Sequence, residues 1–304
     1  MITAGRDGTQ DGVRPRTLPT TRLHAPSTRL YVLLARKAPL AIVFRRGPSK
    51  HVLALSWDTE KHEFRLGQWF KGRIYERRCD LSPSGEKVIY FAAKYRAPLF
   101  TWTAVSRPPF LTALAMWPKG DAWGGGGLFP NERTIGLNHR KEQMDLAEGF
   151  RLPKSMRVEP CGPHAGRGED DPIWSLRLLR DGWTVKQAPE GWDTKKNSKI
   201  QYGFSRPWIW MKSRGSWTLE MSILGIFERD GPWYVIEHQV TDRAGRTAIS
   251  LGRSDWCCSR TRWRELHRSH DLTFSHMRGK RNRNAIFAFS STSLQCSAVS
   301  EGEP

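Results

Sequence analysis

This chain of 304 residues has few cysteines and no long apolar run. Its five cysteines are an odd number, and Cys257 and Cys258 are adjacent, which excludes the paired framework of a small secreted protein. The longest apolar run, LYVLLARKAPLAIVF, is broken by Arg36 and Lys37 and is too short to span a membrane. The first 28 residues lack the apolar core of a signal peptide. We therefore expect a cytoplasmic protein with no membrane partner.

Acidic residues are scarce relative to basic ones. Lys and Arg number 49 against 30 Asp and Glu, which gives a formal net charge of +19 at pH 7. A field of this sign attracts polyanions, so we expect weak, non-specific nucleic-acid binding. Residues 1–50 carry a net +8 and residues 251–304 a net +4, so the two ends hold +12 of the total. The favoured interpretation is that basic terminal segments, rather than a folded surface, inflate the charge.

The chain divides into three segments by composition. Residues 1–28 mix Arg, Thr, Pro and Gly, and we expect them to be disordered or to be an over-extended gene start. Residues 29–256 alternate short apolar runs with Gly-containing turns and are expected to form one domain. Residues 257–304 lose this alternation and are expected to be a poorly ordered basic tail. One hypothesis for this tail is a shift out of an ancestral reading frame.

Within the middle segment, most apolar runs predict strands. Runs such as EKVIYFA and WYVIEHQV are rich in β-branched and aromatic residues, which favour β structure, and PIWSLRLL (residues 172–179) is also predicted to be a strand. The exceptions are RKEQMDLAEGF (residues 140–150), which predicts a short helix, and two predicted loops at residues 159–171 and 189–199. Fourteen tryptophans are expected to anchor the core and its rims, since each buries a large apolar surface.

A turn motif gives the most specific indication of architecture. The run CDLSPSGEKVIYFAAKY, Cys79 to Tyr95, places a Ser-Pro-Ser-Gly turn directly before a β-rich strand. Leu81–Phe91 resembles the S-P-D-G-x-x-[IV]-x-[FY] turn and strand of β-propeller blades, such as those of the Tol-system periplasmic propeller. Ser84 stands where that family usually has Asp, and both side chains can hydrogen-bond within a turn. The resemblance implies that this hairpin belongs to a four-stranded blade.

These patterns together predict an all-β fold. The favoured form is a propeller-like array of short antiparallel strands, which could be incomplete at the C-terminus, and the alternative is a β-sandwich or barrel. Residues 29–256 also resemble bacterial families that have no assigned activity, and this resemblance implies no activity.

Residues that could carry chemistry have weak surroundings. The run Gly124–Gly127 is followed by Leu128 rather than by Lys and Ser or Thr, so it predicts close backbone approach instead of a phosphate loop. Cys161 and His164 lack a nucleophile motif, and Glu237 and His238 should face opposite sides of a strand. In the tail, Cys257 and Cys258 are adjacent and so lack the spacing of zinc-binding cysteines, although His267, His270 and His276 follow them. We expect no cofactor, no metal and no identifiable catalytic residue.

The leading functional hypothesis is a non-catalytic binding or interaction scaffold for an unknown protein or small ligand. Trp102, Trp117 and Trp123 flank the glycine run and are the candidate ligand-binding residues, with burial in the core as the alternative for each. One rival is a carbohydrate-active enzyme on a propeller fold. The other is a nucleic-acid-associated protein, which the basic cluster RGKRNR (Arg278–Arg283) would serve.

Overall fold

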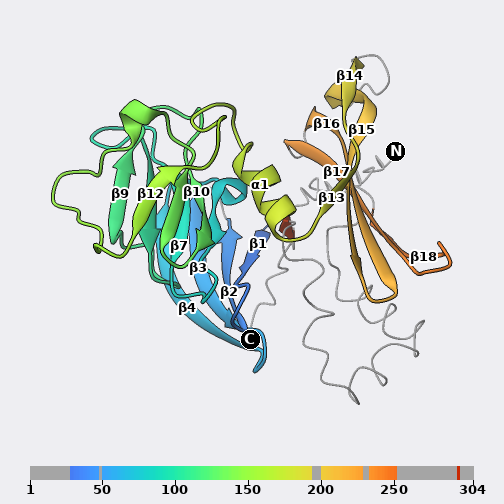
Figure 1. The fold of residues 1–304 in the computed structure, drawn as a ribbon, viewed down its shortest axis with the longest axis horizontal. Coiled ribbons are helices and arrows are strands. Elements are labelled where there is room, and N and C mark those ends of the chain that lie inside the picture. The colour runs from blue at the N-terminus through green and yellow to red at the C-terminus, as the bar shows by residue number, and fades with distance from the viewer. Residues whose placement is uncertain (1–27, 48–49, 194–199, 229–232, 252–292, 295–304) are drawn as a thin grey trace, which may run out of the picture.

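A computed structural model describes residues 28–47, 50–193, 200–228, 233–251 and 293–294 (Figure 1). Over these residues the chain is all-β, with 51% strand and 7% helix, and none of its sheets closes into a barrel. The prediction of an all-β fold is therefore confirmed. The expectations for residues 1–27 lie outside the described residues, as do those for the tail apart from Ser293 and Leu294.

The first sheet contains the N-terminal strands. Its order is β19-β1-β2-β3-β4, and all neighbours pair antiparallel. The strands are β1 (Arg29–Leu34), β2 (Leu40–Arg46), β3 (His51–Asp58), β4 (Glu63–Lys71) and β19 (Ser293–Leu294). The inner side chains of β1 to β3, which include Leu33, Phe44 and Val52, enter the largest hydrophobic cluster of the molecule.

A second sheet lies against the inner face of the first. It is built from β5 (Arg73–Ile74), β6 (Asp80–Leu81), β7 (Val88–Ala93), β8 (Thr101–Ser106) and β9 (Ala115–Pro118), with the 3-10 turn η1 (Glu76–Arg78) between β5 and β6. All six residues of β7 are buried, which explains its continuous apolar sequence. Tyr90 packs toward the first sheet, whereas its neighbour Ile89 packs toward the third.

The third sheet completes a layered arrangement (Figure 1). It contains β10 (Gly127–Asn131), β11 (Thr134–Leu137) and β12 (Arg157–Pro160), and β12 runs parallel to β11. The antiparallel β10–β11 pair forms a hairpin whose turn follows Asn131. The predicted helix over residues 140–150 is reduced to a single 3-10 turn, η2 (Lys141–Gln143).

One helix separates this layered part from the last sheet (Figure 1). The sequence predicted a strand over residues 172–179, and this prediction is wrong, because α1 (Ile173–Arg180) forms there. Its buried side chains recur at helical spacing, as Ile173, Trp174, Arg177 and Leu178. The Asp171 carboxylate accepts hydrogen bonds from the Ser175 backbone N–H at 3.2 Å and from its hydroxyl at 2.6 Å, which fixes the first turn.

The last sheet packs its tryptophans against α1. It contains β13 (Thr184–Gln187), β14 (Glu190–Asp193), β15 (Ile200–Arg214), β16 (Trp217–Glu228), β17 (Tyr234–Thr241) and β18 (Thr247–Leu251). The polar loop predicted from residue 189 to 199 is wrong at its start, because β14 pairs with β15. Trp183 and Trp210 join Trp174 of α1 in a buried cluster, as expected of core tryptophans.

The turn motif has the local structure that its sequence predicted. Gly85 has a φ of 82°, and its N–H donates to the Ser82 carbonyl at 2.9 Å. β6 and β7 then pair antiparallel with Leu81 opposite Val88. The hairpin is confirmed, whereas its membership of a propeller blade stays a prediction. None of the helices in the described ranges has the length and hydrophobicity of a membrane span.

Candidate functional site

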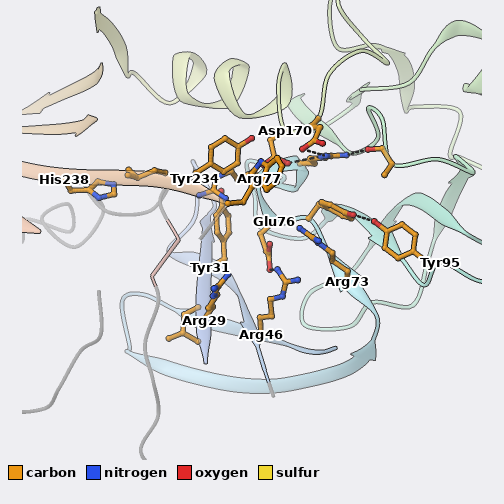
Figure 2. A pocket seen from close by; sticks show the side chains of 17 residues that line it. Arg29, Tyr31, Arg46, Arg73, Glu76, Arg77, Tyr95, Asp170, Tyr234 and His238 are labelled. Atoms are coloured by element: carbon orange, nitrogen blue, oxygen red, sulfur yellow. Dashed lines mark hydrogen bonds and ion pairs between the residues drawn. The ribbon is translucent and has the colours of Figure 1, made fainter. Parts of the chain in front are cut away.

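A cleft of about 350 Å³ opens where distant parts of the chain meet, at β1, β2, η1 and β17 (Figure 2). In Figure 2, Tyr95 and His238 lie at opposite ends, and most of the labelled arginines lie between them. The charged residues that line the cleft are five arginines and three acids, namely Arg29, Arg46, Arg73, Arg77, Arg78, Glu76, Glu169 and Asp170. The lining therefore carries an excess of positive charge.

Two of the five arginines are engaged with acids. Arg78 is almost fully buried and pairs with Asp170 at 2.9 Å, and it also donates to the carbonyls of Ala122 and Gly124 at 2.7 Å each. Arg46 lies 3.8 Å from the Glu76 carboxylate. Arg78 is part of the framework, because its own contacts join η1 to the loops that follow β9 and β12.

The other three arginines, Arg29, Arg73 and Arg77, have no carboxylate within ion-pair distance among the residues that the structure describes. Aromatic rings position two of them instead. The Arg73 guanidinium lies 4.4 Å from the ring centre of Tyr75, and that of Arg77 lies 4.4 Å from the ring centre of Tyr234. Cation–π contacts hold a guanidinium in place but leave its N–H groups available to an anion.

The electrostatics of the cleft follow from this crowding of positive charge. Burial lowers the pKa of Arg29, and the guanidinium of Arg46 lowers it further, with smaller effects from Arg77 and Arg73 that Glu76 partly opposes. At the other end, burial and the charge of Arg77 lower the pKa of His238 to about 3. Burial is the largest cause of both shifts, and the further lowering comes from neighbouring arginines, which make the cleft a region of positive potential.

β17 supplies one side of the cleft through strand alternation. Tyr234, Ile236 and His238 lie two residues apart, point to the same face and line the cleft. Glu237 lies between them and is not part of the lining, as the alternation predicted. Burial, together with the neighbouring Asp170, raises the pKa of Tyr234, so its hydroxyl stays protonated and can donate.

Two tyrosines define the end of the cleft opposite His238. The hydroxyls of Tyr75 and Tyr95 are hydrogen-bonded to each other. Burial and this hydrogen bond raise the pKa of Tyr75 to about 12. The Tyr95 side chain remains 47% exposed, and its φ of 54° lies in the left-handed region that tyrosine rarely adopts.

The three tryptophans proposed from the sequence are not brought together, and none lines the cleft. Trp117 is fully buried, and Trp102 is 7% exposed with its ring edge-on to Phe70 at 5.8 Å. Both therefore belong to the core, which was the alternative for each. Trp123 is 60% exposed, and its role in ligand binding stays a prediction.

The glycine run is a point of close backbone approach, as expected. Its N–H groups are used internally: those of Gly124, Gly125 and Gly126 donate at 2.6–2.7 Å to Gly168 O, Asn138 O and Thr103 Oγ1. A Cβ at Gly126 would lie 2.1 Å from the Arg78 carbonyl oxygen. The run therefore offers no free N–H groups to a phosphate at these three positions, and it allows η1 to pack closely.

Two further side chains that could carry chemistry, His139 and the sequence candidate Cys161, lie apart from the cleft. His139 is buried, with Nε2 bonded to the Thr103 hydroxyl at 2.8 Å and Nδ1 to the Gln143 carbonyl at 2.9 Å. Burial raises the pKa of the Cys161 thiol to about 11, which makes it a poor nucleophile. Among the described residues, no group of three or more His, Cys, Asp or Glu side chains could hold a metal ion.

Sequence reasoning missed the cleft. Arg29, Arg46 and Arg77 come from β1, β2 and η1, and no sequence pattern links them. One signal was available, because Arg73, Arg77 and Arg78 fall within six residues beside aromatic Tyr75. A scan of protein-family models and searches of curated proteins and of solved structures find no match to this chain.

Proposed function

We propose that the protein is a non-catalytic binding module whose cleft holds a small phosphate-bearing anion. The observation that carries this proposal is the convergence of Arg29, Arg73 and Arg77 without paired carboxylates in the described chain. Guanidinium groups match the oxygens of phosphate in a bidentate arrangement. A volume of about 350 Å³ falls within the range of small-molecule sites.

The cleft holds like charges close together. Arg29 is half-buried beside Arg46, with Arg73 and Arg77 near enough to lower its pKa. Such a cluster opposes folding unless an anion neutralises it or water screens it. A bound phosphate would remove this repulsion, and the aromatic contacts of Arg73 and Arg77 reduce the entropy that ordering these side chains costs.

The carbohydrate-active alternative gains less support from this cleft. A glycosidase needs two carboxyl groups on opposite sides of the scissile bond. Here Glu169 and Asp170 are consecutive and both lie near Arg78, at 3.9 and 2.9 Å. Their negative charge serves that buried guanidinium, and binding without turnover is the simpler role for the site.

Isothermal titration calorimetry with tripolyphosphate tests the proposal on the full chain. We expect saturable binding that weakens by about tenfold in Arg73→Ala, because one charge-assisted contact to phosphate is worth about 1.4 kcal/mol. Arg73→Lys should recover part of the loss, since it keeps the charge but not the bidentate geometry. Arg107→Ala is the matched control, because Arg107 is exposed and lies outside the cleft. Equal affinity in the Arg73 and Arg107 alanine variants would contradict the proposal.

A further inference from the structure

One end of the cleft presents the aromatic ring of Tyr95. This residue follows β7 and is 47% exposed although it lines the cleft. Three contacts fix it: its N–H donates to the Phe100 carbonyl at 3.1 Å, its ring lies edge-on to that of Phe100 at 5.9 Å, and its hydroxyl bonds to Tyr75. The ring is therefore held in one place while one part of its surface remains open.

The backbone at this position carries strain. A φ of 54° is energetically unfavourable and unusual for a non-glycine residue other than Asn or Asp. Such conformations persist where surrounding contacts over-determine them, and they cluster at ligand-binding positions. Asn or Gly would adopt this backbone more readily, so the tyrosine side chain is retained at an energetic cost.

The ring lies next to the phosphate-binding arginines. Arg73 lies over the ring of Tyr75 at 4.4 Å, and the hydroxyl of Tyr75 meets that of Tyr95. In Figure 2, Arg73 and Tyr95 lie near each other at one end of the cleft. A ligand that places phosphate on Arg73 would therefore carry its adjoining group toward Tyr95.

We infer that the cleft recognises a nucleoside phosphate, with the phosphates on Arg29, Arg73 and Arg77 and the base stacked on Tyr95. This inference rests on the proposed function and adds the ring-bearing class of ligand to it. Any of the nucleobases can stack on a tyrosine ring, and arginine contacts the phosphates next to the base. The same chemistry is presented by a free nucleotide and by a nucleotide of a single strand.

The test compares ATP with tripolyphosphate, which has a triphosphate chain but no base. Calorimetry on the full chain, without divalent cations, is expected to show ATP binding about tenfold tighter, the usual effect of one base–aromatic contact. Tyr95→Asn should abolish this preference, because Asn tolerates the left-handed backbone but lacks the ring. Tyr95→Phe should keep it, which separates the ring from the hydroxyl bond to Tyr75. Trp69→Ala, which removes an exposed aromatic outside the cleft, should also keep it.

The outcomes separate this inference from the proposed function. If both ligands bind wild-type protein equally, or if the preference survives in Tyr95→Asn, the nucleoside assignment is overturned and the anion site stands. If neither ligand binds, both are overturned. A 5′-phosphorylated, dye-labelled DNA dodecamer then distinguishes the sources. If the dodecamer binds, is displaced by ATP and binds more weakly to Tyr95→Asn, the ligand is a nucleotide of a single strand. If ATP binds but the dodecamer does not bind or is not displaced by ATP, the ligand is a free nucleotide.

Discussion

Six arginines of the described residues form two groups with different surroundings. Arg78, Arg177 and Arg180 are bound into the framework: Arg78 pairs with Asp170, Arg180 with Asp80 at 3.0 Å, and Arg177 donates to the Cys79 carbonyl and the Tyr31 hydroxyl. Arg29, Arg73 and Arg77 face the cleft and have no carboxylate partner in the described ranges. Adjacent residues of η1, Arg77 and Arg78, belong to different groups.

This difference shows how one residue type serves two purposes. A buried guanidinium is tolerated only where carboxylates or carbonyls satisfy it, and it then joins segments that are far apart in sequence. Arg180, for example, joins α1 to Asp80 of β6 across 100 positions. A guanidinium at the edge of a cleft needs no such partner in the free protein, and its N–H groups remain available to a ligand.

Breaking the framework group should have the largest effect. Arg78→Ala removes the ion pair and both carbonyl contacts and leaves Asp170 buried without its cation. We expect the free energy of unfolding to fall by about 3–5 kcal/mol, as for other broken buried pairs. Urea denaturation measures this, and exposed Arg107→Ala should change it by less than about 0.5 kcal/mol. A loss below about 1 kcal/mol in Arg78→Ala would place Arg78 outside the framework group.

A pH titration tests the cost of an unpartnered buried charge on a second group, the imidazole of His139. Burial is the main cause that lowers the pKa of His139 to about 4 in the folded protein, against about 6.5 when unfolded. The unfolded chain therefore takes up a proton first as the pH falls, and stability is full above pH 6.5 and declines toward pH 4. The contribution is of order 3 kcal/mol.

The measurement is the difference between wild type and His139→Gln. Both proteins retain His238, whose pKa is also lowered, so its contribution to the pH dependence is common to both. The variant loses the bond to Thr103 and should be less stable at pH 7, yet its stability should fall less between pH 7 and 5. Parallel pH profiles would show that His139 is not held neutral.

Removing a cleft arginine should have the smallest effect on the fold. Arg29→Gln keeps much of the side-chain packing and removes one of several crowded charges. We expect the free energy of unfolding to change by less than about 0.5 kcal/mol, or to rise slightly at low salt because repulsion is relieved. Denaturation at low and at physiological salt checks this. A marked loss of stability would move Arg29 into the framework group.

Local chemistry made part of the fold predictable. The Ser-Pro-Ser-Gly turn carries its own hydrogen bonds and a glycine in the left-handed region, so the hairpin at residues 81–91 could be predicted without tertiary contacts. The helix α1 could not, because Arg177 occupies a buried position and interrupts the apolar pattern that marks a helix face. Only the partners of Arg177, Tyr31 and Cys79, explain its burial.

The site was less predictable than the fold for a topological reason. Its arginines become neighbours only when β1, β2, β5 and η1 meet, and Arg29 and Arg77 are separated in sequence by the strands β2 to β5. The tryptophans around the glycine run were predicted to bind ligand only because they lie near that run in the sequence. Trp102 and Trp117 proved to be core residues, for which burial of apolar surface is sufficient explanation.

The assembly of the cleft from distant segments gives the protein a built-in reporter of ligand binding. An unfolded chain has no such cleft, because the segments that line it are then dispersed, so a ligand of the cleft binds the native state alone. Mass action then links occupancy to the unfolding equilibrium, by about 2.7 kcal/mol when the free ligand is at a hundred times its Kd. The melting temperature of the intact chain can therefore rank a library of phosphorylated metabolites, with no label or activity assay.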